Sequence, residues 1–208
     1  MFSLKKVFLS LITLSSFFVA ATPALAASPD GFGPWADKVV STQQGLMKNG
    51  QPVPAIRSSA QSALGVAEND TVEGHFYSLG LGGKITLGFK NGMRNGVIVV
   101  EATNPNYPLE KATVEVSPDK EHWFTAGTVT QDGQVTVPQT AGCVHYVRLT
   151  DVSNAADFGD GTADGYDVDG VKGTGERCSI RERHNPKNHN SFCGSYSAKK
   201  EQEIDNGD

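Results

Sequence analysis

The chain has 208 residues, and its 23 acidic against 18 basic residues give a net charge of −5. An acidic chain of this kind does not supply the clustered Lys and Arg side chains that neutralise phosphates, which argues against a nucleic-acid partner. The length suffices for one domain with a full hydrophobic core and a tail. Glycine, valine and threonine are frequent and leucine is modest, a composition that favours many short strands over long helices.

The first 26 residues have the three parts of a secretory signal peptide. Two lysines precede an apolar run over residues 7–19, and the sequence ALA at 24–26 supplies the small residues of a signal-peptidase site. No later segment approaches the roughly 18 apolar residues that a membrane span requires. We therefore expect cleavage after residue 26 and a soluble protein without a transmembrane anchor, in the periplasm, at the cell surface or outside the cell.

Segments with strand character follow one another from residue 34 to residue 171. Apolar residues that alternate or run together predict strands over 34–43, 84–89, 97–100, 111–116, 123–129, 135–137, 144–150 and 166–171. One helical turn is expected within 58–64, and turn signals at Asn91-Gly92 and Asn95-Gly96 separate strands. Strands and turns at this spacing favour an all-β fold, an antiparallel β-sandwich or jelly roll, over alternating β-α units.

The last part of the chain has a different character. Residues 172–208 are almost wholly polar and lack hydrophobic periodicity, so we expect a loop-like or disordered tail. This tail is either a solubilising extension or a contact for an anionic polymer at the cell envelope. Export predicts one disulfide among the three cysteines. Cys178 and Cys193 are the preferred pair because they lie close together in the tail, and Cys143 with Cys178 is the competing connectivity.

An aspartate-rich stretch, DGTADGYDVDG, occupies residues 160–170. It begins like an EF-hand calcium loop, but its twelfth position is Val171 instead of the bidentate glutamate that such a loop requires. Two interpretations remain open. In the first, the aspartates form turns and line a solvated face. In the second, some of them bind a metal ion.

The second half of this stretch has the spacing that a metal site needs. If it is a strand, Tyr166 and Val168 face the core, whereas Asp167 and Asp169 share the opposite face with α-carbons roughly 7 Å apart. Asp164, on the preceding loop, can reach the same place. Three carboxylates so placed could bind a hard cation such as Ca²⁺ with the help of further oxygen ligands. The role of such an ion would be structural.

Catalytic signatures do not occur in the sequence, which contains neither G-x-S-x-G nor H-E-x-x-H. Paired carboxylates near Asp167 and Asp169 could still act on a polysaccharide, because glycoside hydrolysis uses two acidic residues. Sugar binding uses exposed aromatic rings, which present a large apolar face. Tyr107, in the loop ATNPNYPLE, is the better candidate for such a ring, whereas Trp123 is expected in the core.

Seven segments, taken in order, resemble a known class of domain. They are PWADKVVS, SALG, FYSLGLGGKITLGF, VIVVEATN, ATVEVSPDKEHWFTAGTV, HYVRLTDVS and TADGYDVDGV. Their order and spacing resemble the galactose-binding-like jelly roll, of the discoidin or carbohydrate-binding-module type, in exported bacterial surface proteins that include PEP-CTERM proteins. The resemblance covers about residues 34–171. It implies an all-β sandwich with a binding or surface role rather than catalysis.

The same resemblance implies a structural calcium ion near the place where the N- and C-terminal strands meet. Matched to this chain, it assigns Asp164, Asp167 and Asp169 as ligands, with Glu101 and Asp151 as weaker candidates. We therefore expect a secreted, non-enzymatic module that binds Ca²⁺ structurally and contacts a glycan or another envelope component. The alternatives are a polysaccharide-acting enzyme on the same scaffold and a purely structural surface or matrix component, because such sandwiches host many functions.

Overall fold

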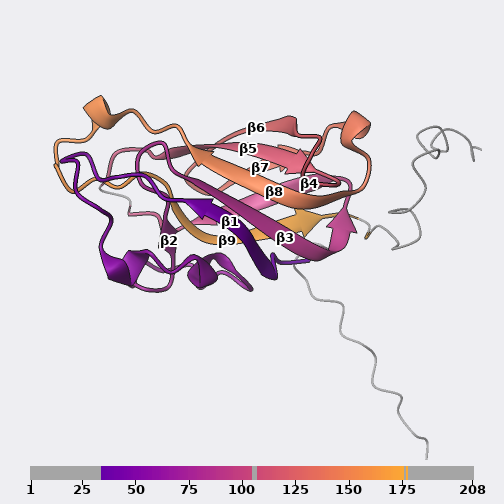
Figure 1. Cartoon of the computed structure of the whole chain (residues 1–208), viewed down its shortest axis with the longest axis horizontal. Helices are drawn as coiled ribbons and strands as arrows, with labels where there is room; N and C mark the ends of the chain where they lie inside the picture. Colours follow the sequence, from indigo (N-terminus) through magenta and orange to yellow (C-terminus); the bar gives the residue numbers. More distant parts are fainter. Residues whose placement is uncertain (1–33, 105–106, 176, 178–208) are drawn as a thin grey trace, which may run out of the picture.

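Two antiparallel sheets face each other across the hydrophobic core in the computed structural model, which describes residues 34–104, 107–175 and 177 (Figure 1). The first sheet has the order β1 (Lys38–Gln43), β3 (Lys84–Met93), β8 (Val144–Asp151), β5 (Lys111–Ser117) and β6 (Phe124–Thr130). The second has the order β2 (Tyr77–Ser78), β9 (Asp167–Thr174), β4 (Gly96–Glu101) and β7 (Gly133–Thr136). The predicted antiparallel β-sandwich is confirmed.

Alternation along the strands places apolar side chains between the sheets. In β5, Ala112, Val114 and Val116 are fully buried, while the intervening residues face outward. On the neighbouring β8, Val147 and Leu149 are buried in the same way. Because successive side chains of a strand point to opposite faces, this period of two is what the core requires.

Short 3₁₀ turns connect the strands. They are η1 (Ala55–Arg57), η2 (Ala60–Ala63), η3 (Gln139–Ala141) and η4 (Ala155–Asp157). The helical turn expected within 58–64 is η2, and η1 and η2 lie together along one side of the sandwich next to β2 (Figure 1). Within the described residues, no helix has the length and apolar character needed to cross a membrane.

Two strands, β3 and β9, extend at least three residues past their expected ends. Asn91-Gly92 does not form the predicted turn but lies inside β3, where the register with β8 shifts between Gly88 and Met93. Glycine at 92 is explained by packing, since a Cβ there would lie 2.5 Å from Sγ of Cys143. Strand β9 runs to Thr174, past the boundary expected at residue 171.

Several predictions concern residues outside the described part of the chain. These are the signal peptide, most of the polar tail and the pair Cys178 and Cys193. Cys143, directly before β8, is the one cysteine in the described part of the chain, and its Sγ lies 3.4 Å from Nε2 of His145. Which of the three cysteines pair stays a prediction.

A contact between two glycines holds together the loops at one end of the sandwich. The Gly45 amide donates to Leu79 O at 2.8 Å, and the Leu81 amide donates to Leu46 O at 2.9 Å. A Cβ on Gly80 would lie 2.4 Å from the carbonyl carbon of Gly45. Side chains do not fit between these backbones.

The loop that contains Gly45 also holds the aspartate-rich stretch. The Lys48 amide donates to Ala163 O and the Asn49 amide to Gly161 O, each at 2.8 Å. The glycine contact therefore fixes the position of the segment that leads into β9.

This contact predicts a difference between two glycines with similar backbones. Gly80 and Gly50 have φ values of +73° and +79°, but a Cβ on Gly50 would meet nothing within 4 Å. In both alanine variants the backbone is strained to the same degree, because φ is positive at both positions. In Gly80→Ala the new methyl group also clashes with the Gly45 backbone, and such overpacking typically costs about 1–3 kcal/mol. We expect Gly80→Ala to lower the free energy of unfolding by that additional amount in urea titrations. Equal losses for the two variants would contradict the packing role of Gly80.

Candidate functional site

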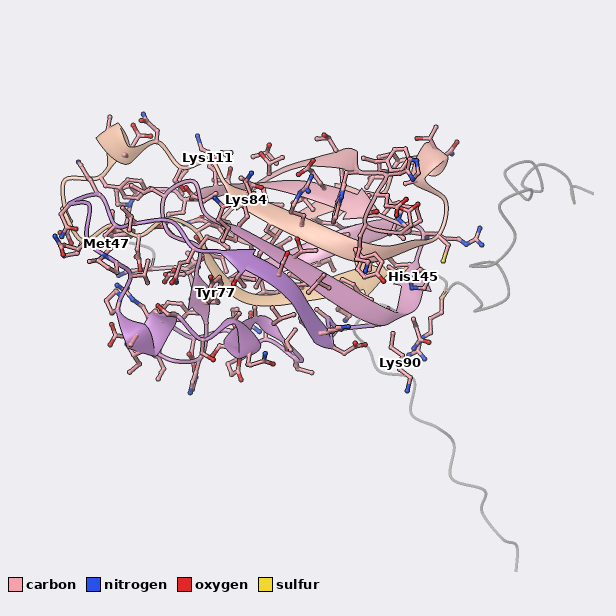
Figure 2. All side chains as sticks on the ribbon, in the orientation of Figure 1. Met47, Tyr77, Lys84, Lys90, Lys111 and His145 are labelled. Carbon is pink, nitrogen blue, oxygen red and sulfur yellow. The ribbon has the colours of Figure 1, made fainter. Side chains whose placement is uncertain are left out.

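A pocket of about 260 Å³ opens at one end of the sandwich. Its lining residues come from η1, from the segment before β2, from the connection between β4 and β5, and from the segment that leads into β9. Met47 lies at this end of the molecule, and His145 and Lys90 lie at the opposite end (Figure 2).

The lining of this pocket is strongly acidic. One basic residue, Arg57, faces six acidic ones, which are Glu73, Glu101, Glu110, Asp160, Asp164 and Asp167. Glu101 and Glu110 are each only 6% exposed, and Asp164 is 4% exposed. Removing carboxylates from water is unfavourable unless they are paired, hydrogen-bonded or protonated. All three solutions are found in this pocket.

Glu101 and Glu110 can both be buried because they share a proton. The two carboxyl groups are hydrogen-bonded to each other, and Thr103 Oγ1 donates to Glu101 Oε2 at 2.7 Å. Burial raises the pKa of Glu101. Burial, followed by the charges of Asp167 and Glu101, raises the pKa of Glu110 to about 11. Glu110 is therefore neutral at pH 7 and donates to Glu101.

Asp164 and Asp167 share Ser78 as a hydrogen-bond partner, and Asp164 is also ion-paired with Arg57. Nη2 of Arg57 lies 3.1 Å from Oδ2 of Asp164. Ser78 pairs with Asp167 across β2 and β9, and its Oγ donates to Asp167 Oδ1 at 2.5 Å. Burial raises the pKa of both aspartates, and for Asp167 the charge of Asp164 raises the pKa further.

Asp169 and Asp151 lie outside this pocket. The carboxylate of Asp169 accepts from the backbone amides of Glu68 and Asn69, at 3.1 and 2.7 Å. Asp151 accepts from the amide of Gly82 at 2.9 Å and from the amide of Tyr166 at 3.0 Å. Both carboxylates fix loops to the sandwich, and their backbone partners satisfy them.

The strand geometry of the aspartate-rich stretch is partly as predicted. Tyr166 and Val168 are fully buried in the core, as expected. Asp169 lies at a register shift in the β4–β9 pairing, between Val168 and Gly170, and its carboxylate is bonded to the amides of Glu68 and Asn69. As a result, Asp167 lines the pocket and Asp169 does not.

The five predicted calcium ligands are therefore not gathered at one point. Glu101, Asp164 and Asp167 line the same pocket, but no three of the five place ligand atoms within 4.8 Å of one another in the described part of the chain. Among the described residues, one group of three does place its ligand atoms within 4.8 Å of one another, and it consists of Asp119, Glu121 and His122.

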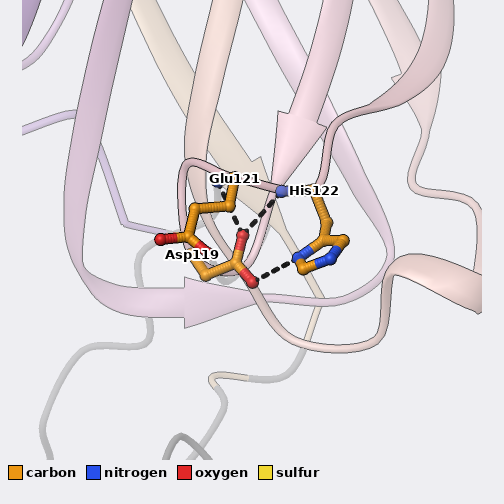
Figure 3. Close-up of side chains that lie close together, drawn as sticks. All are labelled: Asp119, Glu121 and His122. Atoms are coloured by element: carbon orange, nitrogen blue, oxygen red, sulfur yellow. Dashed lines mark hydrogen bonds and ion pairs between the residues drawn. The ribbon is translucent and has the colours of Figure 1, made fainter.

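That group of three is an exposed turn between β5 and β6 (Figure 3). Asp119 accepts from the backbone amides of Glu121 and His122 at 2.9 and 2.8 Å, and its other oxygen lies 2.8 Å from Nδ1 of His122. The three side chains lie close together because these hydrogen bonds form a tight turn, which needs no metal ion.

The aromatic predictions had different outcomes. Tyr107 lines the pocket, and its half-buried ring packs against Phe158 with 5.5 Å between centroids. Trp123 is not in the core: it is half-buried outside it, where the guanidinium of Arg148 lies 4.1 Å from the centre of its ring. Sequence reasoning missed Arg57 and could not place Glu110, a candidate carboxylate for glycoside hydrolysis, because no motif around either residue marks a site.

Comparisons with known proteins concern the fold. No protein-family model and no curated protein matches the chain. One similar solved structure is the C-terminal domain of a chitobiase from Bacteroides fragilis, at 14% identity over 70% of this chain and 96% of that one, with a TM-score of 0.41. Another is a CBM32 module from a family 31 glycoside hydrolase of Clostridium perfringens, at 15% identity over 67% and 90%, with a TM-score of 0.42.

A third similar structure is a CBM32 module produced by Clostridium perfringens, in complex with GlcNAc-α-1,4-galactose. It shares 10% identity over 71% of this chain and 96% of that one, with a TM-score of 0.39.

The raised pKa of Glu110 predicts how stability depends on pH. The folded protein retains a proton on Glu110 that the unfolded chain releases above its ordinary pKa of 4.5. Stability from this group is therefore present at low pH and is lost as pH rises. We expect Glu110→Gln, which is neutral at every pH, to reduce the fall in Tm between about pH 5 and about pH 9 and to raise Tm at the upper end by at least about 2 °C.

Glu121→Gln is the matched control, because the same substitution there changes an exposed side chain at the far end of β5. Its Tm should follow that of the unmodified protein over the whole pH range. Parallel curves for Glu110→Gln and the unmodified protein would contradict the buried, neutral state of Glu110.

Proposed function

We propose that the protein is an exported, non-catalytic module that binds a glycan in the acidic pocket. The observation that carries the proposal is the pocket itself, in which a half-buried tyrosine ring faces a dense set of polar side chains. Carbohydrate sites need this combination, because a sugar ring has apolar faces and a rim of hydroxyl groups. Export follows from the signal peptide predicted at residues 1–26.

The size of the pocket suits a small part of a glycan. Pockets that bury drug-sized ligands have volumes of about 300–1,000 Å³, and this one has about 260 Å³. A single sugar ring, such as the end of a chain, is the unit that a pocket of this size would accept. The remainder of the glycan would then extend into solvent past the exposed rim at Asp160.

The positions of the carboxyl groups favour binding over hydrolysis. Retaining glycosidases hold their two carboxyl groups about 5–5.5 Å apart, and inverting enzymes hold them farther apart. Glu101 and Glu110 are instead hydrogen-bonded directly to each other. Asp167 and Asp169, the pair considered for an enzyme, do not face the same space, since Asp169 is bonded to the loop that covers it.

Tyr107 provides the test of the glycan proposal. We expect Tyr107→Ala to weaken binding to the best ligand of a glycan array by about tenfold or more, because stacking on the ring is lost. Tyr107→Phe, which keeps the ring, should retain most of the affinity. Trp123→Ala removes a ring at the other end of the sandwich and should leave binding unchanged. Absence of any glycan ligand would instead favour a purely structural surface or matrix role.

Calcium is a second proposed ligand of the same pocket, supported by the shared position of Glu101, Asp164 and Asp167. Hard cations prefer carboxylate oxygens, and a bound ion would have to draw these groups closer together. The expected result is a Tm that rises with added Ca²⁺ and falls with a chelator, a response lost in Asp167→Asn. Asp169→Asn should keep the response, because Asp169 lies outside the pocket. A Tm insensitive to both additions would exclude the ion and leave the glycan proposal intact.

A further inference from the structure

We propose that a second binding site, on the outer face of the five-stranded sheet, takes a sugar that carries a carboxylate. This site goes beyond the glycan binding proposed for the acidic pocket and does not rest on it, because the two sets of lining residues share no member. Lys90, which lines the second site, lies at the end of the molecule opposite Met47 (Figure 2). Three observations support the site: a hollow in the sheet, an aromatic ring beside it and an excess of lysine around it.

The hollow has a volume of about 190 Å³ and forms where a strand lacks a side chain. Leu87 and Phe89 of β3 are buried in the core, so Gly88 between them faces outward. The cross-strand partners of Gly88 are Lys38 of β1 and Tyr146 of β8. Neighbouring strands lie about 4.8 Å apart, so the backbones of these two partners are separated by about 10 Å with only a glycine between them.

Two irregularities of the strands shape this hollow. Glycine inside a strand weakens it and often marks a place where a ligand approaches closely. A Cβ on Gly88 would lie 3.3 Å from Cγ2 of Val40 and 3.7 Å from Cε1 of Tyr146, so a side chain there would occupy the hollow. In β1 the register with β3 shifts between Val39 and Ser41, which leaves Val40 as an extra residue. Such bulges redirect side chains and are frequent next to functional sites.

Lysines line the hollow although the chain as a whole is acidic. Lys38, Lys90 and Lys120 lie there with one acidic residue, Asp37, and all four are exposed. The Asp37 carboxylate already accepts a hydrogen bond from the Lys90 amide at 2.7 Å. In the described part of the chain, neither Lys38 nor Lys120 is paired with a carboxylate. The excess of positive charge therefore attracts an anion.

The tyrosine ring favours a sugar over a simple anion. Tyr146 is half-buried beside Gly88, and Nζ of Lys120 lies 5.5 Å from the centre of its ring. The apolar face of a sugar ring can lie against the tyrosine. A carboxylate on the same sugar would accept hydrogen bonds from the lysine ammonium groups, which are donors only. An acidic sugar therefore uses both features of the hollow.

The experiment compares charged and neutral forms of the same sugar ring. Isothermal titration of the full chain near pH 7 would use glucuronate and galacturonate, each against its neutral parent, glucose or galactose. We expect one of the two uronates to bind at least about tenfold more tightly than its parent. Added salt should weaken that uronate most, because salt screens charge pairs. Acetate, which has the carboxylate without the ring, should bind at least about tenfold more weakly than the uronate.

Matched variants connect the binding to the hollow. Lys38→Gln removes one positive charge from the lining and should weaken uronate binding several-fold. Lys84→Gln makes the same substitution at an exposed lysine of β3 that does not line the hollow, and it should leave the affinity unchanged. Gly88→Ala places a methyl group in the hollow and should also weaken binding several-fold. Circular dichroism and Tm would confirm that all three variants are folded.

The possible results separate this site from the acidic pocket. A neutral parent that binds as tightly as its uronate would overturn the proposal. Acetate that binds as tightly would also overturn it, because the hollow would then be a simple anion site. Uronate binding that is lost in Tyr107→Ala and kept in Lys38→Gln would overturn it as well, because the sugar would then occupy the acidic pocket. Absence of uronate binding would overturn this site alone and leave the glycan proposal for the acidic pocket standing.

Discussion

The burial of carboxyl groups at one end of the sandwich is the constraint to which the surrounding residues respond. Glu101, Glu110 and Asp164 lie almost completely out of water, close to Asp167 and around one shared pocket. A carboxylate in this position has to be paired, hydrogen-bonded or protonated. The ion pair with Arg57 and the proton shared by the two glutamates are both answers to this requirement. Pairing, hydrogen bonding and protonation together explain how this end of the sandwich tolerates so many buried carboxyl groups.

Buried carboxyl groups in this protein fall into two kinds that differ in their partners. Asp151 and Asp169 accept hydrogen bonds from backbone amides and hold loops in place, so their charge is already satisfied. Glu101, Glu110, Asp164 and Asp167 in the pocket depend on side chains and on one another, and burial raises the pKa of all four, as it does for Asp169. Perturbed groups that converge on a cavity are typical of functional sites. The same chemical group thus stabilises the scaffold in one setting and forms the candidate site in the other.

Much of the fold could be predicted from the sequence because strands and turns depend on patterns within a few neighbouring residues. The alternation in β5 and the turn at Asn95-Gly96 are visible within a few residues. The site was only partly predictable, because it depends on contacts between distant segments. Asp169 lies outside the pocket because its carboxylate is hydrogen-bonded to the amides of Glu68 and Asn69, about a hundred positions earlier in the chain. Glu110, directly before β5, is buried beside Glu101 of β4, and no local sequence pattern predicts that contact.

The protonation state of Glu110 tests the central claim most directly. Carbon-detected NMR can follow its side-chain carboxyl carbon as pH is raised from about 4 to about 9, with Glu121 as an exposed internal reference. The Glu110 signal should stay at the position of a protonated carboxyl throughout, because burial and neighbouring charges raise its pKa to about 11. A Glu110 signal that titrates with a midpoint near the ordinary value of 4.5 would contradict it.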